Sequence, residues 1–486
     1  MTTLSRSCAQ SGASRNPPWF LAAYLAAIVA QLALAAGLAS AHWDHTGQLP
    51  LGGSPDSGRF AAGTDTAMRR ITAALLQHRS QAILASDRSA FLATVDPRSS
   101  RFITTQARLF QRVIEVPFSR WDHQVRGSVS PSVAQFWLPR LQRRYGAPVW
   151  LAEVTIAHRF NAVSDFELTG THYLTFVLRG GSWYLAADDD LESSGLRSSR
   201  QLWDFGPVVA AAGAGTLVLG HLVQQDFVQQ VGALTGRARA AVNGRFDVAG
   251  TPVVVMVPSD LHETRQLVPS AGGDEGLHLA ALSAVTTSGT STDPHQAYVV
   301  INTETMAGLG EAEQSAILRH ESAHIATWDA AGINSPTWLS EGIAEYAAYA
   351  DSGLGPARFA PELAAAVRAG KLPQQLPTRQ MFDSDDVPSD AAPSDQDLPT
   401  GLAYRYAWSA CALLVERVGL TELVELYRRA NTTADDNEIG SKAGSVWPSA
   451  LQDGLSLSLR DFTQLWREYL VTMFDKPLLD QPRATP

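Results

Sequence analysis

Cysteine is scarce in this sequence, which has only Cys8 and Cys411 among its 486 residues. Cys8 precedes an apolar N-terminal segment and Cys411 lies deep in the C-terminal part. A disulfide between them is therefore not expected, and cysteine does not identify a cellular compartment. Cys411 is flanked by Ala410 and Ala412, and we expect it to be a small buried apolar residue.

An excess of positive charge is also absent. Lys and Arg together number 38 against 48 Asp and Glu, which gives a formal net charge of -10. This balance argues against a nucleic-acid partner, because proteins that bind nucleic acids present a basic face. A hydrophobic content of 45% with 18% charged residues excludes a disordered chain. The length exceeds what one ordinary core holds, so two or more folded units are predicted.

One long hydrophobic run is present, near the N-terminus. Residues 1–18 are polar and include two arginines but no acidic residue, and residues 19–38 are apolar except for Gln31. About 20 apolar residues suffice to span a bilayer as a helix, and the flanking positive charge places residues 1–18 in the cytoplasm. We therefore predict a transmembrane anchor or signal segment at 19–41. The small residues Ala39-Ser40-Ala41 leave a cleaved signal open, and both alternatives put the remaining chain outside the cytoplasm.

A first folded unit is predicted after a linker at residues 42–63, which are rich in Gly, Ser, Pro and Asp. From Thr64 the apolar residues follow helical spacing, and further along they alternate as in strands. Gly180-Gly181 separates two such runs, which predicts a β-hairpin because glycine tolerates positive φ. In the order of its elements, residues 64–203 resemble the nuclear-transport-factor-like cone fold, without any shared motif. The resemblance implies a bent antiparallel sheet covered by helices.

A second unit is predicted at residues 204–478, followed by a tail at 479–486. The run 208–222 predicts two short strands, and 253–257 and 298–302 predict one strand each. Helical periodicity then dominates toward the C-terminus, with a predicted core of Leu413, Leu414, Leu423, Leu426, Phe462, Leu465 and Trp466. The fold class is therefore α+β, with a small sheet and a mostly helical C-terminal lobe in the second unit.

The central motif is His320-Glu321-Ser322-Ala323-His324. Residues four apart on a helix lie on one face, so the imidazoles of His320 and His324 can reach one cation. Zinc binds neutral imidazole readily. Glu321 stands beside the first histidine, where it can take a proton from a metal-activated water. Taken alone, the motif is also compatible with two surface histidines on an Ala-rich helix.

A second motif follows in the segment Trp338-Leu339-Ser340-Glu341-Gly342-Ile343-Ala344. Pro336 suits the first position of its helix, and Glu341 and Glu345 lie one turn apart on one face. The two motifs together resemble the gluzincin metallopeptidases, the family of thermolysin and the membrane-alanyl-type aminopeptidases. The detailed likeness covers roughly residues 298–350.

The resemblance implies a zincin-type catalytic domain that binds one Zn²⁺ per chain. His320, His324 and Glu341 would be the metal ligands and Glu321 the general base. Glu345 matches the position of a carboxylate that hydrogen-bonds the far nitrogen of a ligand histidine. An ordinary solvated glutamate is the alternative for Glu345.

Two tyrosines and one strand are further candidates for the site. The family often uses a tyrosine or histidine of a later helix to stabilise the oxyanion, and Tyr404 and Tyr406 are the candidates, with helix packing as the alternative for each. The strand at 298–302 is a candidate for pairing with an extended peptide, unless it is an ordinary buried or edge strand. His158 and His295 have no partner at ligand spacing.

We therefore expect zinc-dependent hydrolysis of peptide bonds outside the cytoplasm, with amino- and endopeptidase action both open. The expected partners are a peptide or protein substrate and, through residues 19–41, the cell membrane, but no nucleic acid. The protein would be single-pass with its C-terminal part outside, or secreted after signal cleavage. An anchored binding protein with an inactive peptidase-like domain is the alternative. A structural envelope protein without metal is a third.

Overall fold

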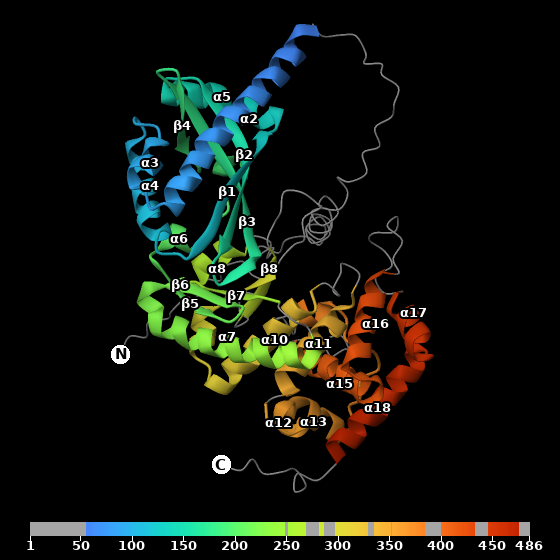
Figure 1. Cartoon of the computed structure of the whole chain (residues 1–486). Coiled ribbons are helices and arrows are strands. Elements are labelled where there is room, and N and C mark those ends of the chain that lie inside the picture. The colour runs from blue at the N-terminus through green and yellow to red at the C-terminus, as the bar shows by residue number, and fades with distance from the viewer. Residues whose placement is uncertain are drawn as a thin grey trace, which may run out of the picture.

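A computed structural model describes residues 55–247, 251–268, 281–285, 297–328, 335–350, 352–383, 400–432 and 446–475. The fold is mixed α+β, with a four-stranded sheet, a five-stranded sheet and a C-terminal group of helices (Figure 1). The predicted segments 1–18, 19–41 and 479–486 lie outside the described residues. No helix in the described part of the chain is both long and apolar enough to cross a membrane.

The N-terminal unit begins with helices and continues into an antiparallel sheet, as predicted, but a further helix is inserted between the first two strands. Its strands are hydrogen-bonded in the order β1-β2-β3-β4. The elements in chain order are α2 (Pro55–Leu84), α3 (Arg88–Ala93), α4 (Ser100–Val113), β1 (Phe118–Ser128), α5 (Pro131–Tyr145), β2 (Val149–Phe160), β3 (Val163–Arg179) and β4 (Ser182–Ala187).

The start of α2 and the β3–β4 turn can each be compared with the sequence predictions. Helix α2 already begins at Pro55, so residues 55–63 are helical and the predicted linker is wrong there. The remainder of that linker lies outside the described residues. The hairpin prediction is confirmed, because β3 and β4 are joined at Gly180 and Gly181, whose φ angles are 55° and 86°. A side chain is strained at such angles, so glycine allows the tight turn.

The five-stranded sheet has the strand order β5-β6-β7-β9-β8. A β5–β6 hairpin forms at one edge, β6, β7 and β9 are mutually parallel, and β8 is antiparallel to β9 at the other edge. Its strands and neighbouring helices are β5 (Val208–Gly213), β6 (Thr216–His221), α7 (Gln225–Phe246), β7 (Val253–Val257), α8 (Leu261–Leu267), β8 (Ala281–Val285), β9 (Ala297–Ile301) and α9 (Thr303–Ala307). The strands predicted at 208–222, 253–257 and 298–302 are thereby confirmed.

One expectation about this sheet is wrong. The strand near 298–302 was a candidate for pairing with a peptide, but β9 has β7 on one side and β8 on the other. Its backbone hydrogen-bonding groups are thus already used by two neighbouring strands. In the described structure, the edge strands of this sheet are β5 and β8.

Both faces of the five-stranded sheet are buried. Alternate side chains point to opposite faces of a strand. Leu219, Met256 and Val300 belong to a core shared with the N-terminal unit, whereas Val218, Val255 and Val299 pack with α7 and the following helices. This explains why the central strands are continuously apolar rather than alternating. The N-terminal unit therefore covers one face of the sheet (Figure 1).

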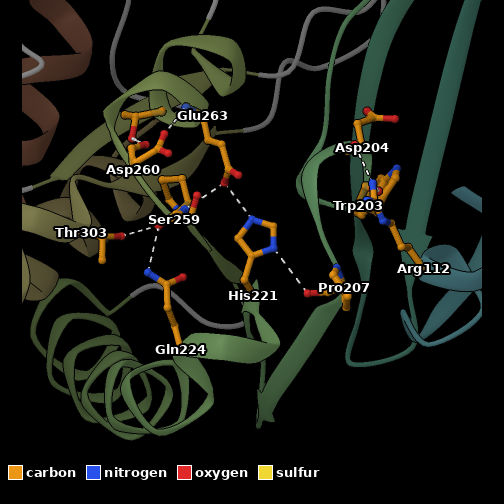
Figure 2. A network of polar contacts seen from close by, with 12 residues as sticks. Arg112, Trp203, Asp204, Pro207, His221, Gln224, Ser259, Asp260, Glu263 and Thr303 are labelled. Carbon is orange, nitrogen blue, oxygen red and sulfur yellow. Dashed lines mark hydrogen bonds and ion pairs between the residues drawn. The ribbon is translucent and has the colours of Figure 1, made fainter. Parts of the chain in front are cut away.

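A polar network lies where the two units meet (Figure 2). His221, at the end of β6, contacts Glu263 of α8 at 2.7 Å through Nε2 and the carbonyl of Pro207 at 3.3 Å through Nδ1. Arg112 of α4 donates to the carbonyl of Asp204 at 2.7 Å. These contacts anchor the segment that connects the first sheet to the second.

The C-terminal lobe is helical, as predicted. It packs around the fully buried Trp408 and Trp466, and all of the predicted core residues except the partly buried Leu465 are buried. Its helices, preceded by α10 (Glu311–Ala326), are α11 (Thr337–Ala350), α12 (Pro356–Phe359), α13 (Pro361–Arg368), α14 (Gln380–Asp383), α15 (Thr400–Val418), α16 (Leu420–Thr432), α17 (Val446–Leu455) and α18 (Leu459–Asp475).

Candidate metal centre

Helix α10 carries the first motif. It starts at a turn in which the backbone N–H of Gly310 donates to Glu313 at 2.8 Å, which satisfies a donor at the helix end. Leu318 and Ile325 are seven residues apart and are buried in the core beneath the sheet. His320 and His324 lie on another face of the helix and line a cavity. The sheet thus orients the helix so that both imidazoles face away from it.

Helix α11 carries the second motif and packs against α10. Leu339 and Ile343 are buried in the core of the C-terminal lobe. Glu341 and Glu345 lie on the cavity side, with side chains that are 18% and 13% exposed. Core packing on one face of α11 therefore directs both carboxylates toward α10.

Gly342 allows this arrangement. A Cβ atom at this position would lie 2.5 Å from the backbone oxygen of Ala407 and 2.5 Å from Sγ of Cys411, both on α15. Helices α11 and α15 therefore approach each other more closely than a larger residue would permit. Cys411 is fully buried at this contact, as expected for a small apolar residue.

Three side chains converge between α10 and α11. Nε2 of His320 lies 3.1 Å from Nε2 of His324 and 3.2 Å from Oε2 of Glu341. The same carboxylate oxygen lies 3.5 Å from Nε2 of His324. Among the described residues, these three are the one group of at least three histidine, cysteine or acidic side chains arranged to hold a metal ion.

The triangle of these atoms has the size that a tetrahedral metal ion requires. Zinc–ligand bonds of roughly 2.0–2.1 Å at tetrahedral angles separate ligand atoms by roughly 3.3–3.4 Å. The separations here are 3.1, 3.2 and 3.5 Å. Two imidazoles and one carboxylate are also the donor types of a catalytic zinc site. The residues present therefore fit a zinc ion.

The electrostatics of the triangle favour a cation. Burial alone would lower the pKa of His320, but its contacts with Glu341 and Glu345 raise that pKa well above the usual value. Burial would raise the pKa of Glu341, but the neighbouring imidazoles hold it far below its usual range. Positive charge between the two helices is thus stabilised by carboxylates that the fold has desolvated.

The outer nitrogen of each imidazole has a different partner. Nδ1 of His320 lies 3.2 Å from Oε1 of Glu345, and Nδ1 of His324 lies 3.5 Å from the hydroxyl of Ser340. Oε2 of Glu345 forms an ion pair with Arg405 of α15. A carboxylate at Nδ1 accepts an N–H there, which leaves the Nε2 lone pair for a metal ion. Glu345 thus lies where the resemblance implied.

The cavity around the triangle has a volume of about 1140 Å³ and is lined by residues of α10, α11, α12 and α15. Glu321 lines it and is only 7% exposed. Tyr404 also lines it, with its ring centroid 6.2 Å from that of His320. Tyr406 is instead buried in the core against Trp466. Of the two tyrosines considered, only Tyr404 faces the cavity.

Sequence reasoning missed three residues that the structure brings to this site. Arg405 pairs with Glu345, Ser340 contacts His324, and Tyr427 hydrogen-bonds Ser340. Ser340 occupies the variable position of the second motif, which is the only signal that could have indicated it. Arg405 and Tyr427 belong to no motif, so only the packing of α15 and α16 reveals them.

His158 lies away from the site. His158 is buried in the N-terminal unit, where it packs edge-on against Trp121 and where burial lowers its pKa to about 3. His295 lies outside the described residues.

Comparisons with known proteins assign no family to the chain, so the site is interpreted from its geometry. No protein-family model matches the chain, and neither a curated protein nor a solved structure matches it.

Proposed function

We propose that this protein is a zinc metallopeptidase of gluzincin type, with one Zn²⁺ held by His320, His324 and Glu341. The observation that carries the proposal is the triangle of Nε2, Nε2 and Oε2 atoms, whose sides of 3.1, 3.2 and 3.5 Å match a tetrahedral zinc site. When bound, the ion supplies Lewis acidity toward a peptide carbonyl and toward water.

The chain's own residues supply the remaining chemistry. Glu321 follows a ligand histidine on α10 and lines the cavity, so it is the general base that takes a proton from the attacking water and passes it to the leaving amine. Tyr404 is placed to donate a hydrogen bond to the oxyanion that develops on the substrate. Tyr406 has no such role, because it belongs to the core.

A peptide or protein substrate is supported by the position of β8. This strand is at the edge of its sheet, packs against α10, and begins at Ala281, which lines the cavity. An edge strand offers unpaired backbone N–H and C=O groups to an extended peptide. The proposed substrate is therefore a polypeptide bound in extended form beside the metal ligands.

The location remains a proposal that rests on the sequence. The apolar segment 19–41 would anchor the protein in the cell membrane or direct its secretion, with residues 64–478 outside the cytoplasm. Within that part, we propose that residues 64–203 form a cone-like domain and residues 204–478 the peptidase domain.

Replacement of Glu321 by Gln tests the catalytic proposal. The variant should bind zinc as the wild type does, while the rate of peptide cleavage falls by roughly 10²–10⁴-fold, the usual contribution of a general base. Zinc content is measured by elemental analysis and cleavage with a mixed peptide library. If the wild type binds zinc but cleaves no peptide, the alternative of an anchored binding protein with an inactive peptidase-like domain is favoured.

A further inference from the structure

The geometry points to Arg405 as a positioning residue of the candidate metal centre. We propose that its guanidinium holds the carboxylate of Glu345, which in turn holds the imidazole of His320 in the orientation and tautomer that a metal ion needs. The inference rests on the proposed zinc site and extends it to the C-terminal lobe, since Arg405 comes from α15.

Glu345 is held from two sides. One carboxylate oxygen, Oε1, lies 3.2 Å from Nδ1 of His320, and the other, Oε2, is paired with Nη1 of Arg405. With a different partner on each oxygen, the carboxylate is restrained from rotating about its terminal bond. Its contact with His320 therefore depends on where Arg405 lies.

Arg405 is itself held in place. Its Cζ atom lies over the ring of Phe359 on α12, 4.3 Å from the ring centroid. Phe359 packs edge-on against Trp408, which is fully buried. A planar guanidinium can stack on an aromatic ring while its edge binds a carboxylate. The hydrophobic core of the lobe thus supports Arg405, and Arg405 supports Glu345.

The burial of these groups makes their orientation matter. The side chains of Arg405, Glu345 and His320 are 28%, 13% and 13% exposed. Ion pairs on open surfaces contribute little because water and salt screen them, whereas pairs removed from water are stronger and more geometrically restrained. A displaced Arg405 would leave a buried carboxylate beside Glu341 without its counter-charge.

The two ligand histidines differ in this respect. Within the described part of the chain, the hydroxyl of Ser340 lies 3.5 Å from Nδ1 of His324, and a hydroxyl can donate or accept. The carboxylate beside His320 can only accept a hydrogen bond, so it selects the tautomer with the proton on Nδ1. Arg405 therefore acts on the more strictly oriented of the two histidines.

An alternative is that the Arg405–Glu345 pair merely ties α15 to α11. The two roles are separated by measuring zinc affinity, through competition with a chromophoric chelator, in Arg405→Gln, Glu345→Ala and the double variant. A positioning role predicts 10–100-fold weaker binding in each single variant, the usual effect of losing a group that orients a ligand. It also predicts that the double variant binds as Glu345→Ala does, within about threefold. Arg405→Lys, which keeps the charge but stacks less well, should fall between wild type and Arg405→Gln.

Arg179→Gln provides a matched control. Arg179 forms two contacts of 3.1 Å with the buried Asp96 in the N-terminal unit, so its loss also breaks an Arg–carboxylate pair. This variant should be less stable but should bind zinc with wild-type affinity.

The positioning role would be overturned if Arg405→Gln bound zinc with wild-type affinity, or if the effects of the two single variants multiplied in the double variant. Either result would leave the zinc site intact. A wild-type protein that binds no zinc would remove the proposed function itself. Cobalt substitution gives a second readout, because a reoriented imidazole changes the visible absorption of bound Co²⁺ even in a variant with little activity.

Discussion

Gly342 and Ala407 are in such close contact that no larger residue fits at position 342. A Cβ atom there would lie 2.5 Å from the carbonyl oxygen of Ala407. The glycine directly follows Glu341, so the helix contact that it permits also fixes the position of this carboxylate relative to the two histidines. Glycine in the second motif is therefore required by the packing of α11 on α15.

Gly342→Ala should accordingly destabilise the protein. The methyl group meets a backbone atom that cannot rotate away, and inserting a methyl group into a packed interior typically costs about 1–3 kcal/mol. Gly236→Ala, within α7, is the control, because nothing lies within 4 Å of its Cβ position and alanine favours a helix by roughly 0.5–1 kcal/mol. Urea unfolding should show opposite changes in the free energy of unfolding, and a neutral result at Gly342 would contradict the packing argument.

Removal of metal should lower both activity and stability. A ligand that binds only the folded protein stabilises it by about 2.7 kcal/mol at a concentration 100 times its Kd. Dialysis against a chelator should therefore lower the Tm and abolish cleavage, and added Zn²⁺ should restore both. Glu341→Gln should lose the dependence of Tm on zinc. An unchanged Tm in the wild type after zinc has been removed would speak against the site.

Tyr404→Phe and Tyr406→Phe should have different effects. Tyr404 lines the cavity, so loss of its hydroxyl should lower kcat by up to roughly 10²–10³-fold, as found for other oxyanion donors. Tyr406 lies in the core, so its variant should change stability more than kcat. Steady-state kinetics and thermal unfolding of both variants distinguish these outcomes. Equal kcat in Tyr404→Phe and wild type would exclude the donor role.

Stability should fall in mild acid because of His158. Burial lowers its pKa from 6.5 to about 3, so the folded protein keeps this imidazole neutral while the unfolded chain protonates it. Below pH 6.5 the unfolded state binds more protons, and stability decreases by up to about 1.4 kcal/mol per pH unit until the folded pKa is reached. Denaturant unfolding between pH 7.5 and 5 measures this slope. His158→Asn should show a shallower slope, and an identical slope would assign the effect to other groups.

The second unit should not fold without the first. One face of the five-stranded sheet, including Leu217, Leu219, Met256 and Val300, is buried against the N-terminal unit. A chain beginning at residue 204 would expose this face to water, and large apolar surfaces of this kind cause aggregation. We expect residues 204–475 to be insoluble or to bind a hydrophobic dye, and residues 55–475 to be soluble and folded. Cooperative unfolding of the shorter chain would show that the units are independent.

Several features followed from local sequence because their physical cause is local. The hairpin around Gly180 depends on glycine at positive φ, and the helices of the C-terminal lobe follow from apolar residues at helical spacing. The start of α2 at Pro55 was missed, since the Gly- and Ser-rich segment before Thr64 lacks an apolar stripe. The interior position of β9 was missed because strand order depends on contacts distant in sequence.

The sequence alone determined which side chains share a helix face. His320 with His324, and Glu341 with Glu345, are paired by the pitch of one helix, whatever the rest of the chain does. Only the tertiary structure decided that these two faces meet, that Arg405 rather than solvent lies beyond Glu345, and that Tyr404 but not Tyr406 enters the cavity. These outcomes depend on how α10, α11 and α15 pack, and such packing is set by shape and burial among residues far apart in the chain.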